Sequence, residues 1–183
     1  MHDEFLVPNG LLDTTFPDDG NVQDLPAPLI EGSTKAGGKV FPTTSRNVSW
    51  GVGEGNVVTT PIDLARWIRH LLKGEAGVNA AQVARMRTCM PTSDRHVTYG
   101  LGITCNPPDL GVGHDGAITG YLTVARHDST NDVTVVVFAS LLDVDDIGGR
   151  MTCCWKPPAK CAPRWAIDRT RICPTQGVRG RRV

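Results

Sequence analysis

The first clear pattern along the chain is a helical one that follows Thr60. Apolar residues recur at intervals of three and four positions up to Leu72, while basic residues lie mostly on the other side. Thr60 offers an N-cap hydroxyl, Pro61 suits the first helical position, and Gly74 suits the stop. We therefore expect a helix over 61–73.

The same reasoning predicts a second, shorter helix. Asn79 is a favourable N-cap, and the pattern continues to about Arg87. Val83 and Met86 lie on the side of this helix that we expect to be buried.

After Pro91 the apolar period changes from that of a helix to that of a strand. We expect strands at about 97–104, at 112–127 with a break, and at 133–142. The last is a nearly continuous apolar run, which is typical of a strand covered on both faces. Short connections between successive strands favour antiparallel pairing. The core residues expected from both patterns are Leu64, Ile68, Leu71, Leu101, Ile103, Val124, Val135 and Val137.

Residues 1–60 are dominated by turn signals, such as Pro8-Asn9-Gly10 and Gly37-Gly38. Only short apolar anchors, among them Leu11-Leu12, lie between these turns. We expect a long connecting region with little regular structure of its own. A compact domain rarely contains such a region unless it is functional or belongs to a larger body.

Charge divides the 183 residues into two parts, although 19 Lys and Arg balance 19 Asp and Glu. Residues 1–149 carry 10 basic and 18 acidic side chains, whereas residues 150–183 carry 9 basic and 1 acidic. We expect a domain over 1–149 and a basic tail rich in Cys, Pro and Arg over 150–183. No apolar run approaches the ~20 residues that span a bilayer, and the acidic start is unlike a secretory signal.

The tail holds four of the six cysteines, at Cys153, Cys154, Cys161 and Cys173. Their spacing departs from the C-x₂₋₄-C pairs of structural zinc sites, so we expect no metal there. Its charge alone would suit nucleic acid or anionic lipid, but we expect a solvated, disordered or non-homologous end and no nucleic-acid partner. The even cysteine count does not assign disulfides.

The most suggestive chemical group is His114, which lies between glycines in Gly113-His114-Asp115-Gly116. A histidine near a strand end can face a cleft, and a glycine beside it lets a ligand approach closely. The spacing alone favours a surface histidine in a glycine-rich turn over a histidine that faces a cleft. The other histidines, which we expect to be structural or solvated, are His2, His70, His96 and His127.

Four separated segments give this motif a context. They are Leu11 to Pro17, Gly53 to Trp67, Tyr99 to Gly102, and His114-Asp115-Gly116 followed by Gly120-Tyr121. In this order they resemble "LGMxDTxF", "AGGLxSTxxDLARW", "YGLGW" and the HxG or KTG motif. These are segments of the serine β-lactamase and D-alanyl-D-alanine carboxypeptidase family, in its class C and esterase-like branch. The resemblance covers roughly residues 5–142.

The resemblance implies a chemistry. In that family a serine of an S-x-x-K motif attacks an amide or ester carbonyl, and the lysine and the tyrosine of a Y-x-N motif move the proton. By resemblance, His114 would steady a substrate carboxylate and the proton network, and Gly116 would provide clearance. The backbone N–H of Ala117 would be one of two oxyanion-hole donors. No cofactor and no metal is implied.

The sequence departs from the family at the nucleophile. It contains no S-x-x-K and no Y-x-N, and in Ser33-Thr34-Lys35 the lysine is one residue too close. In the family both motifs precede the segment with which this chain begins. We therefore expect the C-terminal part of an incomplete α/β domain, with an antiparallel sheet flanked by helices. One exposed sheet edge and no activity in isolation are further expectations.

Two functional classes stay open. The first is a fragment of a hydrolase of β-lactam, D-alanyl peptide or ester bonds, including half of a split enzyme that a chain with the missing N-terminal half would complete. The second is a non-catalytic binding module that keeps the wall around His114. The family is often exported, but the sequence leaves the compartment open. The resemblance stops after Asp146, which suggests an out-of-frame or non-homologous end.

Overall fold

The computed structural model describes five stretches of the chain, all within the unit Met1–Ile147. These stretches are residues 2–18, 27–44, 47–93, 97–105 and 111–146. The predicted basic tail, 150–183, and its four cysteines lie outside the described residues.

Both predicted helices are present and begin at the expected caps. Helix α1 covers Pro61–Lys73, and the side chain of Thr60 accepts a hydrogen bond from the backbone N–H of Asp63 at 3.2 Å. It ends at Gly74, whose φ of 77° is the left-handed conformation that favours glycine. Helix α2 covers Ala80–Met86 and begins with a reciprocal capping box between Asn79 and Gln82.

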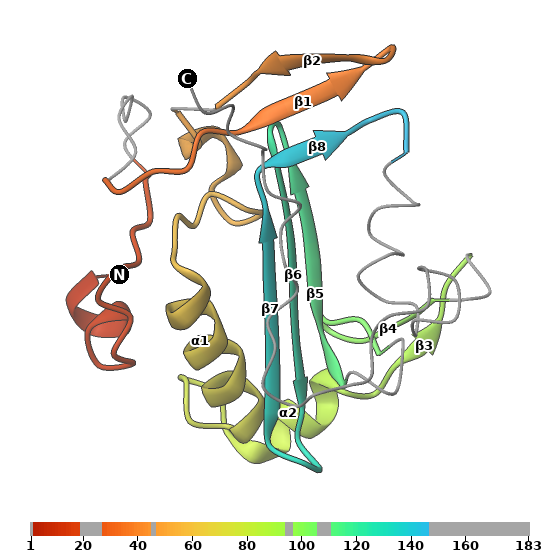
Figure 1. Ribbon diagram of the computed structural model, residues 1–183. Coiled ribbons are helices and arrows are strands. Elements are labelled where there is room, and N and C mark those ends of the chain that lie inside the picture. The colour runs from red at the N-terminus through yellow and green to blue at the C-terminus, as the bar shows by residue number, and fades with distance from the viewer. Residues whose placement is uncertain (1, 19–26, 45–46, 94–96, 106–110, 147–183) are drawn as a thin grey trace. The chain divides into compact units, whose positions relative to one another are not determined.

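Within the described stretches, eight strands form three small sheets, and two single helical turns accompany them (Figure 1). The strands are β1 (Ser33–Ala36), β2 (Lys39–Pro42), β3 (Met90–Pro91), β4 (Thr98–Tyr99), β5 (Val112–Ile118), β6 (Tyr121–Asp128), β7 (Val133–Ala139) and β8 (Leu141–Asp143). A π-helical turn covers His2–Leu6, and a 3₁₀ turn covers Ser49–Gly51.

The sheet β5-β6-β7 confirms the predicted antiparallel meander. Residues paired across an antiparallel sheet share a face, so Val112, His127 and Thr134 lie together on one side. Val112 packs with Ile68 and Leu72 of α1, so the helix covers that side. Among the described strands, β7 pairs only with β6, as the expectation of an exposed edge requires.

The buried core lies between α1, α2 and the start of β5. It comprises Ile68, Leu72, Val83, Ile103 and Val112. Of the predicted core residues, Ile68, Ile103 and Val124 are buried, whereas Leu64, Leu71 and Val137 are only partly buried. Met86 packs against the cluster without being fully buried.

Two core predictions were wrong. Leu101 is 60% exposed because the chain bends there: its N–H donates to Met86, and the side chain projects from a tight turn. Val135 is 36% exposed because it lies on β7, the outer strand of this described sheet, and on the face opposite to the one that α1 covers. The continuous apolar run of β7 therefore does not mean coverage of both faces.

Strand lengths also differ from the predictions. The expected strand 97–104 is regular only at β4, and the run 133–142 is interrupted at Ser140, between β7 and β8. Strand β8 then leaves the central sheet and pairs in parallel with β1. A parallel pair this distant in sequence leaves no local signal.

The region 1–60 contains more regular structure than expected. Strands β1 and β2 form a hairpin whose two turn residues, Gly37 and Gly38, have φ of 56° and 74°. Two consecutive positive φ angles define the type I′ turn that matches the twist of paired strands. Both strands are short and partly or fully exposed, so they lack the alternation that would have revealed them.

A disulfide links Cys89, which follows α2, to Cys105, which follows the turn after β4, with the Cα atoms 6.4 Å apart. It closes a segment that contains β3 and β4. Within the described stretches, no helix has the length and apolarity needed to cross a membrane. The same stretches contain no group of three His, Cys, Asp or Glu side chains placed to hold a metal ion.

Candidate active site

Strand β5 carries all three residues that the sequence singled out. Its start is fixed by Gly113, where an added Cβ would lie 2.0 Å from the carbonyl oxygen of Ala125. The backbone of Gly113 also exchanges two hydrogen bonds with Thr104, of 3.1 and 2.7 Å. Glycine is thus required at this position for packing, and the outer edge of β5 begins beside Thr104.

His114 is exposed, but both of its ring nitrogens have partners. Nε2 lies 2.5 Å from the hydroxyl of Tyr99, and Nδ1 lies 2.5 Å from the backbone carbonyl oxygen of Asp115. The rings of Tyr99 and His114 also meet edge to face, with centroids 5.6 Å apart. A ligand that binds a ring nitrogen of His114 directly must displace one of these two partners.

The side chain of Asp115 lies on the opposite face of β5 from His114. Its carboxylate pairs with the guanidinium of Arg126 on β6, with distances of 2.8 and 2.9 Å to one guanidinium nitrogen. Burial raises the pKa of Asp115, while the positive charge of Arg126 opposes the rise. Burial lowers the pKa of Arg126 for the same reason, and Asp115 opposes that change. The pair fixes the backbone beneath His114.

Sequence reasoning missed this ion pair. Arg126 has no exposed side-chain surface, although arginine is rarely buried unless it is paired. The available signal was a charged residue inside the apolar stretch of β6, at a position that pairs with Gly113. The identity of its partner came only from the register of β5 against β6.

Gly116 has room around it in the described chain. An added Cβ would meet only the side chain of Thr123, at an ordinary contact distance of 3.8 Å. The fold of the described chain therefore does not require glycine at position 116, whereas it does at position 113. The expected role of Gly116 in clearing space for a ligand stays a prediction.

The backbone N–H of Ala117 points away from β6. Ile118 and Tyr121 close the β5–β6 hairpin, and hydrogen-bonded and non-hydrogen-bonded pairs alternate from such a closing pair. Ala117 therefore has the same orientation as Gly113, whose N–H donates outward to Thr104. Between described groups, no hydrogen bond from the Ala117 N–H is seen. Within the described chain, Ala117 thus has an unpaired N–H on the outer edge of β5, and its expected role as an oxyanion-hole donor stays a prediction.

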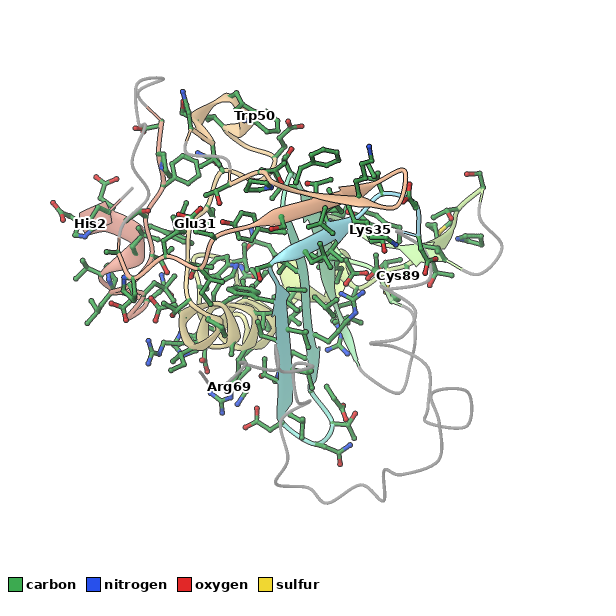
Figure 2. The ribbon with its side chains drawn as sticks, turned by 45° about the horizontal axis from the view of Figure 1, so that its top comes forward. His2, Glu31, Lys35, Trp50, Arg69 and Cys89 are labelled. Atoms are coloured by element: carbon green, nitrogen blue, oxygen red, sulfur yellow. A yellow bond between two sulfur atoms is a disulfide. The ribbon has the colours of Figure 1, made fainter. Side chains whose placement is uncertain are left out.

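The residues nearest to a nucleophile motif lie in another sheet. Ser33-Thr34-Lys35 forms part of β1, and the ammonium group of Lys35 (Figure 2) binds the buried carboxylate of Asp143 at 2.9 Å. Lys35 is thus committed to the pairing of β1 with β8. The expected absence of a serine–lysine motif rests on the sequence itself.

The other histidines fit their predicted structural or solvated roles where they are described. His127 is completely buried on β6, His2 is exposed, and His70 is partly buried on α1. His96 lies outside the described residues.

Comparison with known proteins identifies a family from the sequence and a shared fold from solved structures. A sequence model of the Beta-lactamase family matches residues 1–150. The fold is similar to that of a D-stereospecific amidohydrolase from a Streptomyces species, with a TM-score of 0.65, 22% identity and coverage of 76% of this chain and 42% of the other.

Two further solved structures have a similar fold. A D-amino acid amidase from Ochrobactrum anthropi SV3, complexed with D-phenylalanine, matches with a TM-score of 0.64, 18% identity, and coverage of 80% and 45%. A penicillin-binding protein from Bacillus halodurans matches with a TM-score of 0.61, 16% identity, and coverage of 84% and 48%. Matches at this identity concern the fold, and in each case the chain spans less than half the length of the matched structure.

Proposed function

The chain belongs to the beta-lactamase family, and from this membership we propose that it supplies one wall of a serine-hydrolase site whose nucleophile comes from polypeptide outside this sequence. The observation that carries the proposal is the combination, on β5, of His114 on one face and an outward N–H at Ala117. The sequence contains no S-x-x-K and no Y-x-N, and this supports the proposal that the nucleophile comes from other polypeptide.

In this proposal the Ala117 N–H donates to the oxyanion that develops when a serine attacks a carbonyl carbon. One preorganised donor of this kind contributes about 2.7–4 kcal/mol to the transition state. His114, with Tyr99, would face the substrate carboxylate and the proton network. Gly116 would leave room for the substrate backbone to approach the strand.

Neither group can form an acyl-enzyme, because an N–H donor and an imidazole do not replace the hydroxyl nucleophile of this family. We therefore propose that the chain is inactive alone. Among the described strands, β7 pairs on one side only. This favours completion by a partner strand over a free-standing module, since an unpaired edge offers a row of backbone donors and acceptors. The partner would be a polypeptide that bears S-x-x-K and Y-x-N.

Labelling with a fluorescent penicillin tests this proposal. We expect no covalent label on the purified 183-residue chain, and labelling of the partner's serine after a polypeptide with both motifs is added. His114→Ala should reduce that labelling, whereas His2→Ala, at an exposed and distant site in the sequence, should not. Labelling of any serine of this chain alone would contradict the proposal.

A panel of substrates would then define the bond that is cleaved. The sequence leaves β-lactams, D-alanyl peptides and simple esters open, and the structural relatives named as D-amino acid amidases add D-amino acid amides to the panel. If a partner-completed complex binds members of the panel without turnover, the second class, a non-catalytic binding module, is favoured.

A further inference from the structure

We propose that Tyr99 is a positioning residue that holds the imidazole of His114 in a single tautomer and orientation. The inference rests on the proposed function, because it concerns the residue assigned to the wall of that site. It begins with the 2.5 Å contact between the Tyr99 hydroxyl and Nε2 of His114.

The turn after Tyr99 explains why the tyrosine occupies this place. The N–H of Gly100 donates to the carbonyl oxygen of Ile103 at 2.8 Å, and Gly102 has a φ of 72°. A Cβ at Gly100 would lie 1.9 Å from the carbonyl oxygen of Met86, so only glycine fits there. Both glycines after Tyr99 are thus explained by a tight turn that presents the tyrosine.

Thr104 connects this turn to β5. It forms a bridge with Tyr99 on one side and with Gly113 on the other. Its backbone N–H donates to the carbonyl oxygen of Gly113 at 2.7 Å. His114 is the next residue along β5. The aromatic ring of Tyr99 therefore reaches across Thr104 and meets the imidazole edge to face.

The partners of the two ring nitrogens select the tautomer. The carbonyl oxygen of Asp115 can only accept a hydrogen bond, so Nδ1 of His114 must carry the proton and donate. In the neutral ring Nε2 is then an acceptor, and the Tyr99 hydroxyl is its donor. The backbone and the tyrosine thus specify the same tautomer from the two ends of the ring.

This assignment changes what the wall presents to a ligand. With both ring nitrogens engaged, the Tyr99 hydroxyl oxygen keeps a lone pair, and the tyrosine as a whole is 36% exposed. A ligand donor would form its hydrogen bond with the Tyr99 hydroxyl oxygen. That bond would in turn change the hydrogen bond between Tyr99 and Nε2 of His114. The motif that resembles "YGLGW" therefore acts on the site through Tyr99.

Nitrogen-15 NMR of the histidine rings tests the tautomer directly in the full chain. For His114 at a pH where the ring is neutral, we expect a protonated Nδ1 and an unprotonated Nε2 whose resonance is displaced by the hydrogen bond. In Tyr99→Phe the Nε2 resonance should lose that displacement. A protonated Nε2 in the unchanged neutral ring, or an Nε2 resonance that Tyr99→Phe leaves in place, would overturn the proposal.

Tyr121→Phe is the matched control, since Tyr121 is the other tyrosine of the chain and its hydroxyl donates to the carbonyl oxygen of Ile30 at 2.8 Å. It removes a hydroxyl hydrogen bond of similar length without touching His114. We expect no change in the His114 resonances in this variant.

Acylation by diethyl pyrocarbonate, which attacks an unprotonated imidazole nitrogen, gives a second measurement. Modification of His114, located by mass spectrometry, should be faster in Tyr99→Phe than in Tyr121→Phe, with exposed His2 as the internal reference. Equal rates would count against the proposal. Neither measurement requires turnover, so a chain that failed the penicillin test would still report on Tyr99.

Discussion

Thr14 and Asp63 are 49 positions apart and form a buried hydrogen bond of 3.0 Å between the threonine hydroxyl and the aspartate carboxylate. The same carboxylate oxygen accepts from the backbone N–H of Asp13 at 2.8 Å, and Arg66 binds the other oxygen at 2.9 Å. Asp63 therefore ties the N-terminal segment to the start of α1, beside an apolar cavity of about 150 Å³.

Asp63→Ala should destabilise the chain substantially. It removes the acceptor of two hydrogen bonds, one buried and one partly buried. One hydrogen bond to a charged group contributes about 1.5–3 kcal/mol. We expect a loss of that size or larger in the free energy of unfolding, measured by urea denaturation. Asp18→Ala, at an exposed position, is the control, and an equal effect in both variants would contradict the role given to Asp63.

The buried His127 should make stability depend on pH. Its Nδ1 lies 2.9 Å from the Thr134 hydroxyl, and its Nε2 has no hydrogen-bond partner among the described groups. Burial lowers its pKa, a change that Lys73 and Arg69 reinforce. The acidic neighbours that oppose it are Asp132, whose Oδ1 lies 3.9 Å from Nε2, and Asp128.

The sign follows from proton uptake. Because the folded-state pKa of His127 is lowered, the unfolded chain binds more protons just below a pH of about 6.5. Stability should be constant above that pH and fall as the pH drops toward the folded-state pKa. For one proton, the slope is at most about 1.4 kcal/mol per pH unit.

Urea denaturation of His127→Phe between pH 5.5 and 7.5 would measure this contribution. The variant loses the Thr134 contact at every pH, but its stability should vary less with pH over this range. His2→Gln, at an exposed histidine, should retain the slope of the unchanged chain. A slope that His127→Phe leaves unaltered would assign the pH dependence to another group.

Local signals explain which parts of this fold were predictable. Helix α1 was predicted with its correct ends, because Thr60, Pro61 and Gly74 act within a few residues of themselves. Strand β8 was not recognised as a separate element, because its partner β1 lies about a hundred residues away. No short sequence pattern indicates a parallel pair between two strands this far apart.

In the candidate site, too, local sequence patterns predicted some features, whereas others depended on how the strands pair. The placement of His114, Gly116 and Ala117 on one strand followed from a short motif. The contact of His114 with Tyr99 did not, because it depends on two bridges through Thr104 that bring Tyr99 beside β5. Charge pairing across strands, such as that of Asp115 with Arg126, likewise required the register.

Loss of the disulfide should weaken the support for Tyr99. Cys89 and Cys105 are 16 positions apart, and their disulfide bond encloses β3 and β4. Closing a loop of about 15 residues stabilises a protein by about 3 kcal/mol in the chain-entropy description. We expect Cys89→Ser/Cys105→Ser to unfold at a correspondingly lower urea concentration.

The control uses the four tail cysteines. A chain in which only Cys153, Cys154, Cys161 and Cys173 are serine should have the same free energy of unfolding as the unchanged chain. Adding a reductant should then remove the contribution of the Cys89–Cys105 disulfide. When Cys89 and Cys105 are also serine, the reductant should have no effect. A reductant effect in that last variant would show that another reaction was being measured.

Adding a methyl group should lower the free energy of unfolding strongly at Gly113 and hardly at Gly116, the two glycines of the His114 motif. Gly113→Ala forces a Cβ to 2.0 Å from the carbonyl oxygen of Ala125 on β6. We therefore expect a loss of at least the ~1–3 kcal/mol that is typical of overpacking. In Gly116→Ala the nearest atom is 3.8 Å away, so the free energy of unfolding should change little. Thermal and urea unfolding would measure both.

The same pair separates folding from ligand clearance. If Gly116 keeps space for a substrate, the stable Gly116→Ala chain should reduce penicillin labelling once a partner bearing S-x-x-K is added. Because its fold is intact, the loss would come from the methyl group projecting where the substrate must approach β5. Full labelling in Gly116→Ala would remove the clearance role from Gly116 and leave the outward N–H of Ala117 as the contribution of this strand.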